Sequence, residues 1–419
     1  MAESIKAPRG VRDILPEESW KWSYALAQTR QVADLFHYQE VYLPLFEHTE
    51  LFARGVGDTT DIVEKEMYTF IDKGDRSITL RPEMTASMMR SFLEHGESAY
   101  GPTPRLWGYG PMFRYERPQK GRYRQFYQLD FEILGDPAPT ADLEVIMTAI
   151  TLFDRLGMKN LEVVLNSVGC PKCRPIYRQK LLDYLATKEE HLCPNCLSRR
   201  ERNPLRVLDC KVCHDHLVDA PDIFSSLCDE CSDHFKAVTQ GLDALGMSYS
   251  IDKTLVRGLD YYTKTAFEIK SGDLGAQSAV CGGGRYDNLG ESIGGGHVPG
   301  VGFAAGFDRV ILVMEQQGAS FGETPAVDVD VLCLEDGARP LALQVLETLR
   351  RHDLKAHLDD TGRSMKARMK TALAMNARFV AFVGSGEVES GTVTLKNLAT
   401  TEQKTVALAQ LATEVASAD

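Results

Sequence analysis

The apolar positions along the chain predict a helix followed by an antiparallel sheet. Apolar residues recur at helical spacing from Trp20 to Phe36, and Val41 to Glu47 is predicted as one strand. Pro44 lies inside that strand, which favours a sheet edge or a subunit contact over a central position. Arg105 to Leu134 alternates short strand-type runs around a charged loop, as in an antiparallel hairpin, whose sheet commonly leaves one face open for a ligand. Further strands are predicted at Glu162–Asn166, Ala266–Lys270 and Ser278–Cys281.

The pattern changes after Phe321. The run GETPAVDVDV is predicted to be a linker that leads into a strand. From there strand-type and helix-type runs alternate, which predicts a compact α/β domain of about ninety residues. The runs are VDVDVLCL, LALQVLETLRRH, KAHLDD, SMKARMKTALAM, RFVAFVG, GTVTLKNL and QLATEVA.

Length and composition narrow the class of protein. A chain of 419 residues is too long for one ordinary core, so two or three domains are expected. With 43% hydrophobic and 25% charged residues, the composition is that of a soluble globular protein. No apolar run reaches the ~18 residues of a membrane span, and the N-terminal residues resemble neither a secretory signal nor a transit peptide. The expected compartment is therefore the cytoplasm, with no membrane partner.

The net charge of −12 argues against a protein that coats nucleic acid indiscriminately, because such binding relies on many Lys/Arg–phosphate contacts. Three segments are nevertheless basic. Each by itself is typical of a solvated face. Together they favour a large polyanionic partner that is touched at several points. The segments are Arg114–Arg124, Arg199–Arg206 and Arg363–Lys370.

The segment LRPEMTASMMR, Leu80 to Arg90, predicts a junction between a strand and a helix. Glu83 and Thr85 lie at this junction. Such residues most often cap a helix, and the alternative is a pair of acceptors for the ammonium group of a ligand.

The predicted hairpin carries a second set of polar residues. Arg114 ends the first arm, and Phe126, Gln128, Asp130 and Glu132 alternate along the second, so these four side chains are expected on one face. Two carboxylates, an amide and an aromatic ring on one face favour a pocket over a core or plain solvent. An arginine opposite them suits a phosphate, because its planar fork offers two donors to two oxygens.

Two further segments carry arginine. VRGLDYYT, Val256 to Thr263, places Arg257 beside two tyrosines, and Arg309 lies near the start of an apolar helix in GVGFAAGFDRV. CGGGRYDNLG, from Cys281, permits close backbone approach but lacks the Lys-Ser/Thr ending of a phosphate-binding P-loop. Arg114, Arg257 and Arg309 with their neighbours suit a triphosphate and a small cationic or imidazole-bearing substrate, whose identity these residues leave open.

Four C-x-x-C pairs lie in a cysteine-rich segment that is predicted to be an insertion. A cytoplasmic chain keeps its thiols reduced, so zinc is favoured over disulfides, and four pairs fit one or two Cys₄ sites with a structural role. Metal-free pairs are the alternative, and the spacing leaves open which pairs share an ion. The cysteines are Cys170, Cys173, Cys193, Cys196, Cys210, Cys213, Cys228 and Cys231.

These segments resemble the histidyl-tRNA synthetase family of the class II aminoacyl-tRNA synthetases, of the bacterial type, over nearly the whole chain. LVRGLDYYT and CGGGRYDNL resemble two stretches peculiar to that family. FRYERPQKGRYRQFYQLDFE resembles its class II motif 2, GVGFAAGFDRV its motif 3, and QEVYLPLFE its motif 1, with Pro44 at a dimer interface. The resemblance implies an α+β catalytic domain with an antiparallel sheet and a C-terminal α/β anticodon-binding domain. The small, mostly helical, cysteine-rich insertion is expected from the residues themselves, because the cysteines are not part of the family's pattern.

The resemblance also implies roles for single residues. Arg114 and Arg257 would be catalytic at the α-phosphate of ATP, Phe126 would stack on adenine, and Arg309 would reach the γ-phosphate. Mg²⁺ would accompany the pyrophosphate, and Gln119 and Arg122 would meet the acceptor end of tRNA. Residues expected to bind histidine are Glu83, Thr85 and Gln128 at its ammonium group, Glu132 and Tyr262 at its imidazole, and Tyr261 and Tyr286 around the pocket.

The implied activity is that of a histidine–tRNA ligase, which uses ATP, L-histidine and tRNA(His) as a homodimer. The rival is a catalytically silent paralogue that senses histidine as the regulatory subunit of ATP phosphoribosyltransferase. Such a sensor has no use for Arg114, Arg309 or a tRNA-binding domain, so the ligase is favoured. The expected domains are 1–167 with 247–322 for catalysis, 168–246 for the insertion, and 327–419 for the anticodon. A metal-held insertion is expected to touch the acceptor stem.

Overall fold

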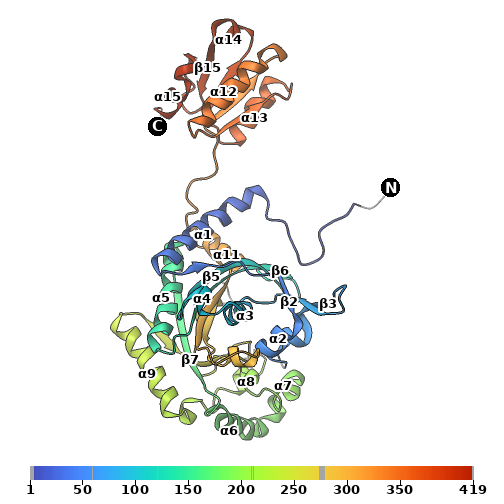
Figure 1. Cartoon of the computed structure of the whole chain (residues 1–419), viewed down its shortest axis with the longest axis vertical. Coiled ribbons are helices and arrows are strands. Elements are labelled where there is room, and N and C mark those ends of the chain that lie inside the picture. The colour runs from blue at the N-terminus through green and yellow to red at the C-terminus, as the bar shows by residue number, and fades with distance from the viewer. Residues whose placement is uncertain are drawn as a thin grey trace. The chain divides into compact units, whose positions relative to one another are not determined.

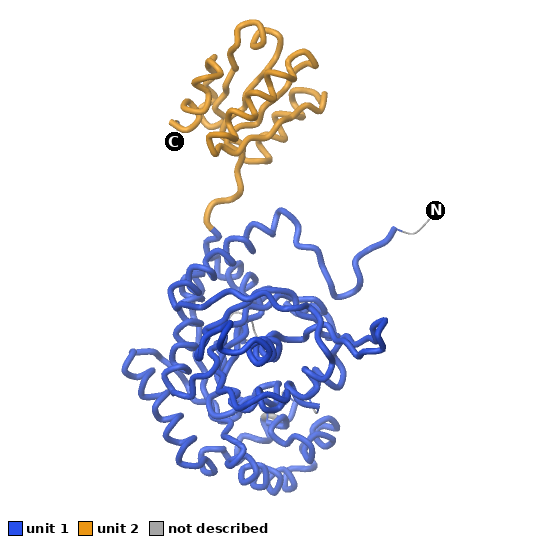
Figure 2. Tube along the Cα trace, in the orientation of Figure 1, with its two compact units in different colours: residues 1–321 blue, residues 322–419 orange. Residues whose placement is uncertain are grey.

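The computed structural model describes residues 4–58, 60–119, 121–208, 210, 212–272 and 279–417. The chain forms two compact units, an N-terminal unit of residues 1–321 and a C-terminal unit of residues 322–419 (Figure 2). The division falls at the start of the predicted linker.

An eight-stranded sheet organises the N-terminal unit (Figure 1). Its order is β1-β5-β6-β11-β10-β9-β7-β8, with parallel pairing at the two edges and antiparallel pairing between. The predicted hairpin is confirmed, because β5 and β6 pair antiparallel from Arg105↔Ile133 to Phe113↔Gln125. The strands are β1 Gln39–Glu40, β5 Arg105–Phe113, β6 Gln125–Leu134, β7 Leu161–Gly169, β8 Tyr249–Ile251, β9 Thr263–Ser271, β10 Ala279–Arg285 and β11 Gly300–Gly306. The strand predicted from Ser278 is β10, and Ser278 itself lies outside the described residues.

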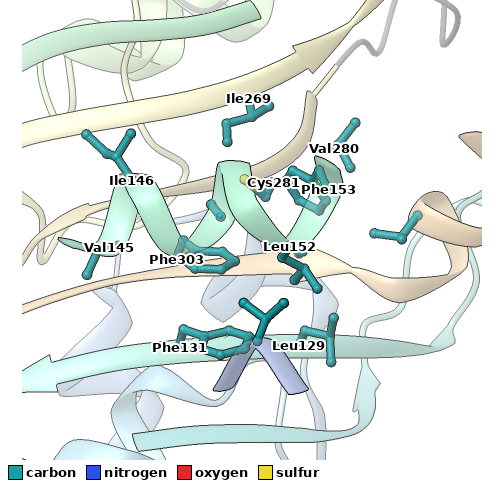
Figure 3. Packing of buried hydrophobic residues seen from close by; sticks show 14 of the residues in the cluster. Leu129, Phe131, Val145, Ile146, Leu152, Phe153, Ile269, Val280, Cys281 and Phe303 are labelled. Atoms are coloured by element: carbon teal, nitrogen blue, oxygen red, sulfur yellow. The ribbon is translucent and has the colours of Figure 1, made fainter. Parts of the chain in front are cut away.

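One face of this sheet carries the main apolar core. Four helices cover it, α1 Pro16–Leu35, α5 Pro139–Arg155, α9 Asp229–Ala244 and α11 Phe307–Gln316. Helix α5 begins at a proline, whose missing N–H costs nothing in a first turn, and its apolar residues recur every three or four positions. Figure 3 shows the result: Ile146 and Phe153 of α5 lie over Phe303 and Ile269 of the sheet.

The opposite face packs against α3 Thr85–His95 through a second cluster that includes Met84, Met88 and three tyrosines. A small sheet of order β2-β4-β3 leads into this helix. Its strands and the neighbouring helices are β2 Phe46–His48, β3 Tyr68–Ile71, β4 Ser77–Leu80, α2 Thr49–Val56, α4 Glu97–Tyr100 and α10 Leu289–Ser292.

The prediction of one strand from Val41 to Glu47 is wrong. The chain pairs with β5 at β1, Val41 N still donates to Trp107 O at 2.9 Å, and the backbone then leaves the sheet until β2 begins at Phe46. Pro44 lies in this irregular stretch. It has no N–H for a ladder and restricts the residue before it, so the strand divides into two short ones.

The cysteine-rich segment is mostly helical, as predicted. Its elements are α6 Arg174–Thr187, α7 Pro194–Arg199, α8 Leu205–Leu208 and α9. Tyr177, Leu181, Leu185 and Val207 form a small core of their own together with Cys196.

The C-terminal unit is a five-stranded sheet of order β13-β12-β14-β15-β16. Odd-numbered residues of β12 and β14, such as Val331 and Ala381, belong to one apolar cluster, and even-numbered ones, such as Leu332 and Val380, to another, so both faces are covered. The predicted alternation of strands and helices is confirmed, and α14 and β16 are additional. The elements are β12 Val329–Cys333, α12 Arg339–Arg351, β13 Ala356–Asp359, α13 Met365–Ala374, β14 Phe379–Val383, α14 Ser385–Ser390, β15 Thr392–Asn397, β16 Gln403–Ala407 and α15 Leu411–Ala416.

Candidate active site

Strand β6 carries the polar residues of the site on one face. Leu129 and Phe131 belong to the apolar core, so the residues that alternate with them point to the side of α3. Gln128, Asp130 and Glu132 are 8%, 0% and 1% exposed, so these polar side chains are buried on this face. This buried polar face is the candidate pocket.

Glu132 is the centre of a hydrogen-bonded group. Its carboxylate accepts from Thr85 Oγ1 at 2.6 Å and from the hydroxyl of Tyr286. Burial raises the pKa of Glu132 to about 8. Gly302 lies opposite Glu132 on β11, and a Cβ there would come within 1.5 Å of the carboxylate, so only glycine leaves room for it.

Several buried acceptors in this pocket have no hydrogen-bond partner among the described residues. Glu83 Oε1 accepts from Ala86 N at 3.0 Å, as a helix cap would, whereas its Oε2 has no partner. Gln128 Oε1 and both carboxylate oxygens of Asp130 are in the same state. Unpaired buried acceptors are costly, so this part of the pocket is suited to a ligand that brings N–H donors.

The loop 256–262 lies beside these acceptors. Tyr261 and Tyr262 are buried with ring centroids 4.8 Å apart, and the ring of Tyr286 is 5.6 Å from that of Tyr261. Arg257 Nη1 donates to Glu268 Oε1 at 2.5 Å, and its guanidinium lies 5.6 Å from the ring of Tyr262. A Cβ at Gly282 would lie 2.2 Å from that guanidinium, so the close approach expected of the three glycines is used here.

Arg114 and Arg309 lie near the N-terminal end of β6. Arg114 Nε donates to Pro82 O at 2.8 Å, and its guanidinium lies 5.2 Å from the ring of Phe126. Arg309 Nη1 donates to Ala279 O at 2.9 Å. The pKa of Arg309 is lowered, first by burial and then by the neighbouring guanidinium of Arg122, with Arg114 also contributing. Closely placed guanidinium groups are suited to a multiply charged anion.

The loop between β5 and β6 carries the residues expected to meet tRNA. Gln119 and Arg122 form an isolated β-bridge, and Arg122 Nη1 donates to Glu116 Oε2 at 2.9 Å. Arg122 also lies near Arg309, whose pKa its guanidinium lowers. The sequence position of Arg122 alone did not predict this proximity.

The eight cysteines form two nested groups. The outer cysteine cluster consists of Cys170, Cys173, Cys228 and Cys231, and the inner cysteine cluster of Cys193, Cys196, Cys210 and Cys213. Within each cluster all sulfur atoms lie within 4.8 Å of one another. Backbone N–H groups point at sulfur in both, with Cys228 N to Cys173 Sγ at 3.0 Å and Cys193 N to Cys213 Sγ at 3.2 Å. Each cluster has the four soft ligands of a tetrahedral metal site.

Comparison with known proteins identifies the family. A model of histidyl-tRNA synthetase matches residues 10–310, and one of an anticodon binding domain matches residues 328–418. Histidine–tRNA ligases of Acetivibrio thermocellus and Desulforamulus reducens are 48% and 50% identical to this chain, each over 96% of it and 97% of the relative. The crystal structure of apo S. aureus histidyl-tRNA synthetase superposes with a TM-score of 0.82 at 36% identity, covering 98% of this chain and all of that one.

The chain belongs to the histidyl-tRNA synthetase family. The family and the fold class expected from the sequence are confirmed, including the C-terminal anticodon-binding domain. The helices of the described residues include none that is both long and apolar enough to cross a membrane.

Two residues of this family member were not predicted to support the site. Asp308 accepts from Tyr127 N at 2.9 Å and from Arg12 Nη2 at 3.3 Å, so it ties β6 to α11 next to Arg309. Arg174 donates to main-chain oxygens of the loop 256–262. Both had a sequence signal, since Asp308 precedes Arg309 and Arg174 follows Cys173, but the partners of each are distant in sequence.

Proposed function

We propose that this chain activates L-histidine with ATP, giving histidyl-adenylate and pyrophosphate, and then transfers histidine to the 3′ end of tRNA(His). The observation that carries the proposal is the buried polar group in which Glu132, bonded to Thr85 and Tyr286, lies with the unpaired acceptors of Glu83 and Gln128. The full-length relatives named histidine–tRNA ligase support this reaction over the regulatory paralogue.

Histidine offers donors at both ends of the molecule. Its ammonium group would donate to Glu83 Oε2 and Gln128 Oε1, with Thr85 nearby, which relieves the cost of leaving these acceptors unpaired. Its imidazole would lie between Glu132 and Tyr262, with the aromatic rings of Tyr261 and Tyr286 around it. An apolar amino acid leaves these polar groups without partners, so the pocket discriminates by hydrogen bonding.

The arginines would bind ATP and stabilise charge as the histidine carboxylate attacks the α-phosphorus. Arg114 and Arg257 would hold the α-phosphate from two sides, Phe126 would stack on adenine, and Arg309 would reach the γ-phosphate. Mg²⁺, bound to the phosphate oxygens, would neutralise charge on the departing pyrophosphate. Catalysis by this chain would rest mainly on positioning and charge stabilisation, because the site would hold the reactants between fixed guanidinium groups.

The deciding experiment is ATP–pyrophosphate exchange by the purified chain with and without L-histidine, followed by charging of transcribed tRNA(His). We expect exchange that requires histidine and charging that requires this tRNA. Histidine binding without exchange would move the protein to the regulatory class.

Each cysteine cluster would hold one structural Zn²⁺. Four thiolates close the coordination shell, so no position stays open for a substrate, and the ion would fix the fold of a segment with a small core. Metal analysis after purification without chelator is expected to give two zinc ions per chain. A content well below one would refute both sites.

The chain would act as a homodimer. Large apolar side chains are exposed around Pro44 and on the small sheet, with Tyr42 80%, Phe46 57% and Ile71 63% exposed. A partner subunit that covers this surface would remove it from water. Light scattering is expected to give the mass of a dimer, and Phe46→Glu is expected to shift it toward the monomer.

For tRNA, Gln119 and Arg122 would meet the acceptor end, the metal-held insertion the acceptor stem, and the C-terminal unit the anticodon. Deletion of 327–419 is expected to abolish charging while exchange remains.

The proposed domain limits, 1–167 with 247–322, 168–246 and 327–419, can be tested by limited proteolysis. We also propose the cytoplasm as the compartment, since the zinc sites need reduced thiols; fractionation of cells tests this.

A further inference from the structure

Arg174 connects the outer cysteine cluster to the loop 256–262. It directly follows Cys173 and is the first residue of α6, and its main-chain N–H donates to Cys170 O at 3.0 Å. Its guanidinium donates through Nε to Val168 O at 3.2 Å, through Nη1 to Asp260 O at 3.3 Å and through Nη2 to Tyr262 O. One side chain therefore holds main-chain oxygens on both sides of Tyr261.

The loop that Arg174 holds has no regular structure, although it carries Arg257, Tyr261 and Tyr262. A backbone outside a helix or sheet needs other donors for its carbonyl groups, and those donors determine its path. The carboxylate of Asp260 in the same loop accepts from Asn203 Nδ2 at 2.9 Å, and its main-chain N–H donates to Val56 O at 3.0 Å. Arg174 belongs to the set of contacts that fixes this backbone.

The side chains on the loop depend on that path. Tyr262 packs 4.8 Å from Tyr261, and Tyr261 packs against Tyr286, which donates to Glu132. A shift of the main chain at Asp260 or Tyr262 would therefore displace both tyrosines relative to Glu132. A displacement of about 1 Å is enough to weaken a hydrogen-bonded pocket strongly.

We propose that Arg174 is a positioning residue for histidine binding, through which the outer cysteine cluster determines the place of Tyr261 and Tyr262. This inference rests on the proposed function of the pocket. It makes the affinity for histidine, rather than for ATP, the property that depends most on Arg174, because the guanidinium of Arg257 on the same loop is held separately by Glu268 of β9. A purely structural role would lower stability and leave the ratio of the two affinities unchanged.

The chain offers a matched control in Arg178. It lies one turn further along α6, and its Nη2 donates to the main-chain oxygen of Glu201 instead of the loop. Arg178 lines the same cavity as Arg174, Asp260 and Tyr262, and among the described residues it donates no hydrogen bond to 260–262. Arg178→Ala therefore removes a guanidinium from the same helix and cavity without removing a donor from the loop. Arg174→Lys keeps the positive charge but offers a single ammonium group, which cannot reproduce a planar fork that reaches three oxygens.

The test uses the full-length wild type, Arg174→Ala, Arg174→Lys and Arg178→Ala. Calorimetry gives the Kd for L-histidine, exchange kinetics give KM for histidine and for ATP, and metal analysis reports zinc. We expect the histidine Kd to rise about ten-fold or more in Arg174→Ala and less in Arg174→Lys, because buried carbonyl groups lose their donor. The KM for ATP is expected to stay within about two-fold, and Arg178→Ala to match the wild type.

Two results would overturn the proposal. One is a histidine Kd in both Arg174 variants within about two-fold of the wild type, and the other is an equal rise in the constants for histidine and ATP. Arg174→Lys decides alone if Arg174→Ala does not fold. If the wild type shows no exchange, the proposed function fails separately, and the histidine Kd values still decide the role of Arg174.

Discussion

Two fully buried carboxylates, one in each unit of the chain, differ in their partners. In the C-terminal unit Asp359 is fully buried, and it accepts from Thr361 and from Arg363 at 3.3 Å, with Arg368 Nε 3.4 Å away. In the N-terminal unit Asp130 is as deeply buried, and neither of its oxygens has a partner among the described residues.

This difference distinguishes a carboxylate that is satisfied within the fold from one that is left without a hydrogen-bond partner. A paired buried carboxylate is satisfied before any ligand arrives. An unpaired one costs about 1–3 kcal/mol, which a ligand with N–H donors can relieve. The unpaired acceptors Glu83 Oε2 and Gln128 Oε1 lie in the proposed histidine pocket, whereas Asp330 Oδ2 of the C-terminal unit is also buried and unpaired, so this property by itself does not identify a site.

The largest expected effect is on catalysis in the N-terminal unit. Arg257→Ala is expected to lower the rate of histidine-dependent exchange by about 10²–10³-fold, because the guanidinium proposed to stabilise the α-phosphate is lost. Exchange kinetics measure the change, and calorimetry checks that histidine still binds. A loss below about ten-fold would remove Arg257 from the reacting centre.

Arg368→Ala tests the opposite unit. Asp359 loses a buried cationic partner, and Cys333 O loses the donor Nη2 at 2.8 Å, so the C-terminal unit is expected to lose about 3 kcal/mol of unfolding free energy. Denaturant unfolding, monitored through hydrogen exchange of the amides in β12 and β14, measures the change in unfolding free energy. Exchange of ATP and pyrophosphate should be unaffected, and a large change in it would contradict the separation of the two units.

Histidine binding should stabilise the N-terminal unit and leave the C-terminal unit unchanged. At about 100 times its Kd, histidine is expected to stabilise the N-terminal unit by about 2.7 kcal/mol, because it binds only the folded pocket. Native-state hydrogen exchange is expected to show added protection in β6 and α3 and none in β12 or β14. Equal protection of both units would argue against a pocket confined to the first.

The last expected effect is a pH dependence from Glu132. Its pKa is raised to about 8 in the folded chain from 4.5, so between these values the folded state binds more protons than the unfolded state. Its contribution to stability is therefore present below 4.5 and is lost as the pH rises through about 8. Without histidine, the Tm of the wild type should fall more steeply across this window than that of Glu132→Gln. Parallel curves would show that Glu132 is ionised throughout.

The sequence alone predicted the features that depend on short-range pattern. The period of two along Phe126–Glu132 placed four side chains on one face, and the helical spacing after Trp20 predicted α1. No comparison with relatives was needed for this, because strand and helix geometry fix which neighbouring residues share a face. The motif segments were sufficient for the family as well.

Tertiary structure decided the contacts that join distant parts of the chain. Cys170 lies with Cys228, 58 residues away, and not with the nearer Cys193, because the fold brings the start of α6 to the start of α9. The same return of the chain places Arg174 on the loop that carries Tyr262, 88 residues away. The C-x-x-C spacing and a single arginine are compatible with any pairing of these groups. The sequence therefore determined the chemical groups, and the packing of helices on the sheet determined their partners.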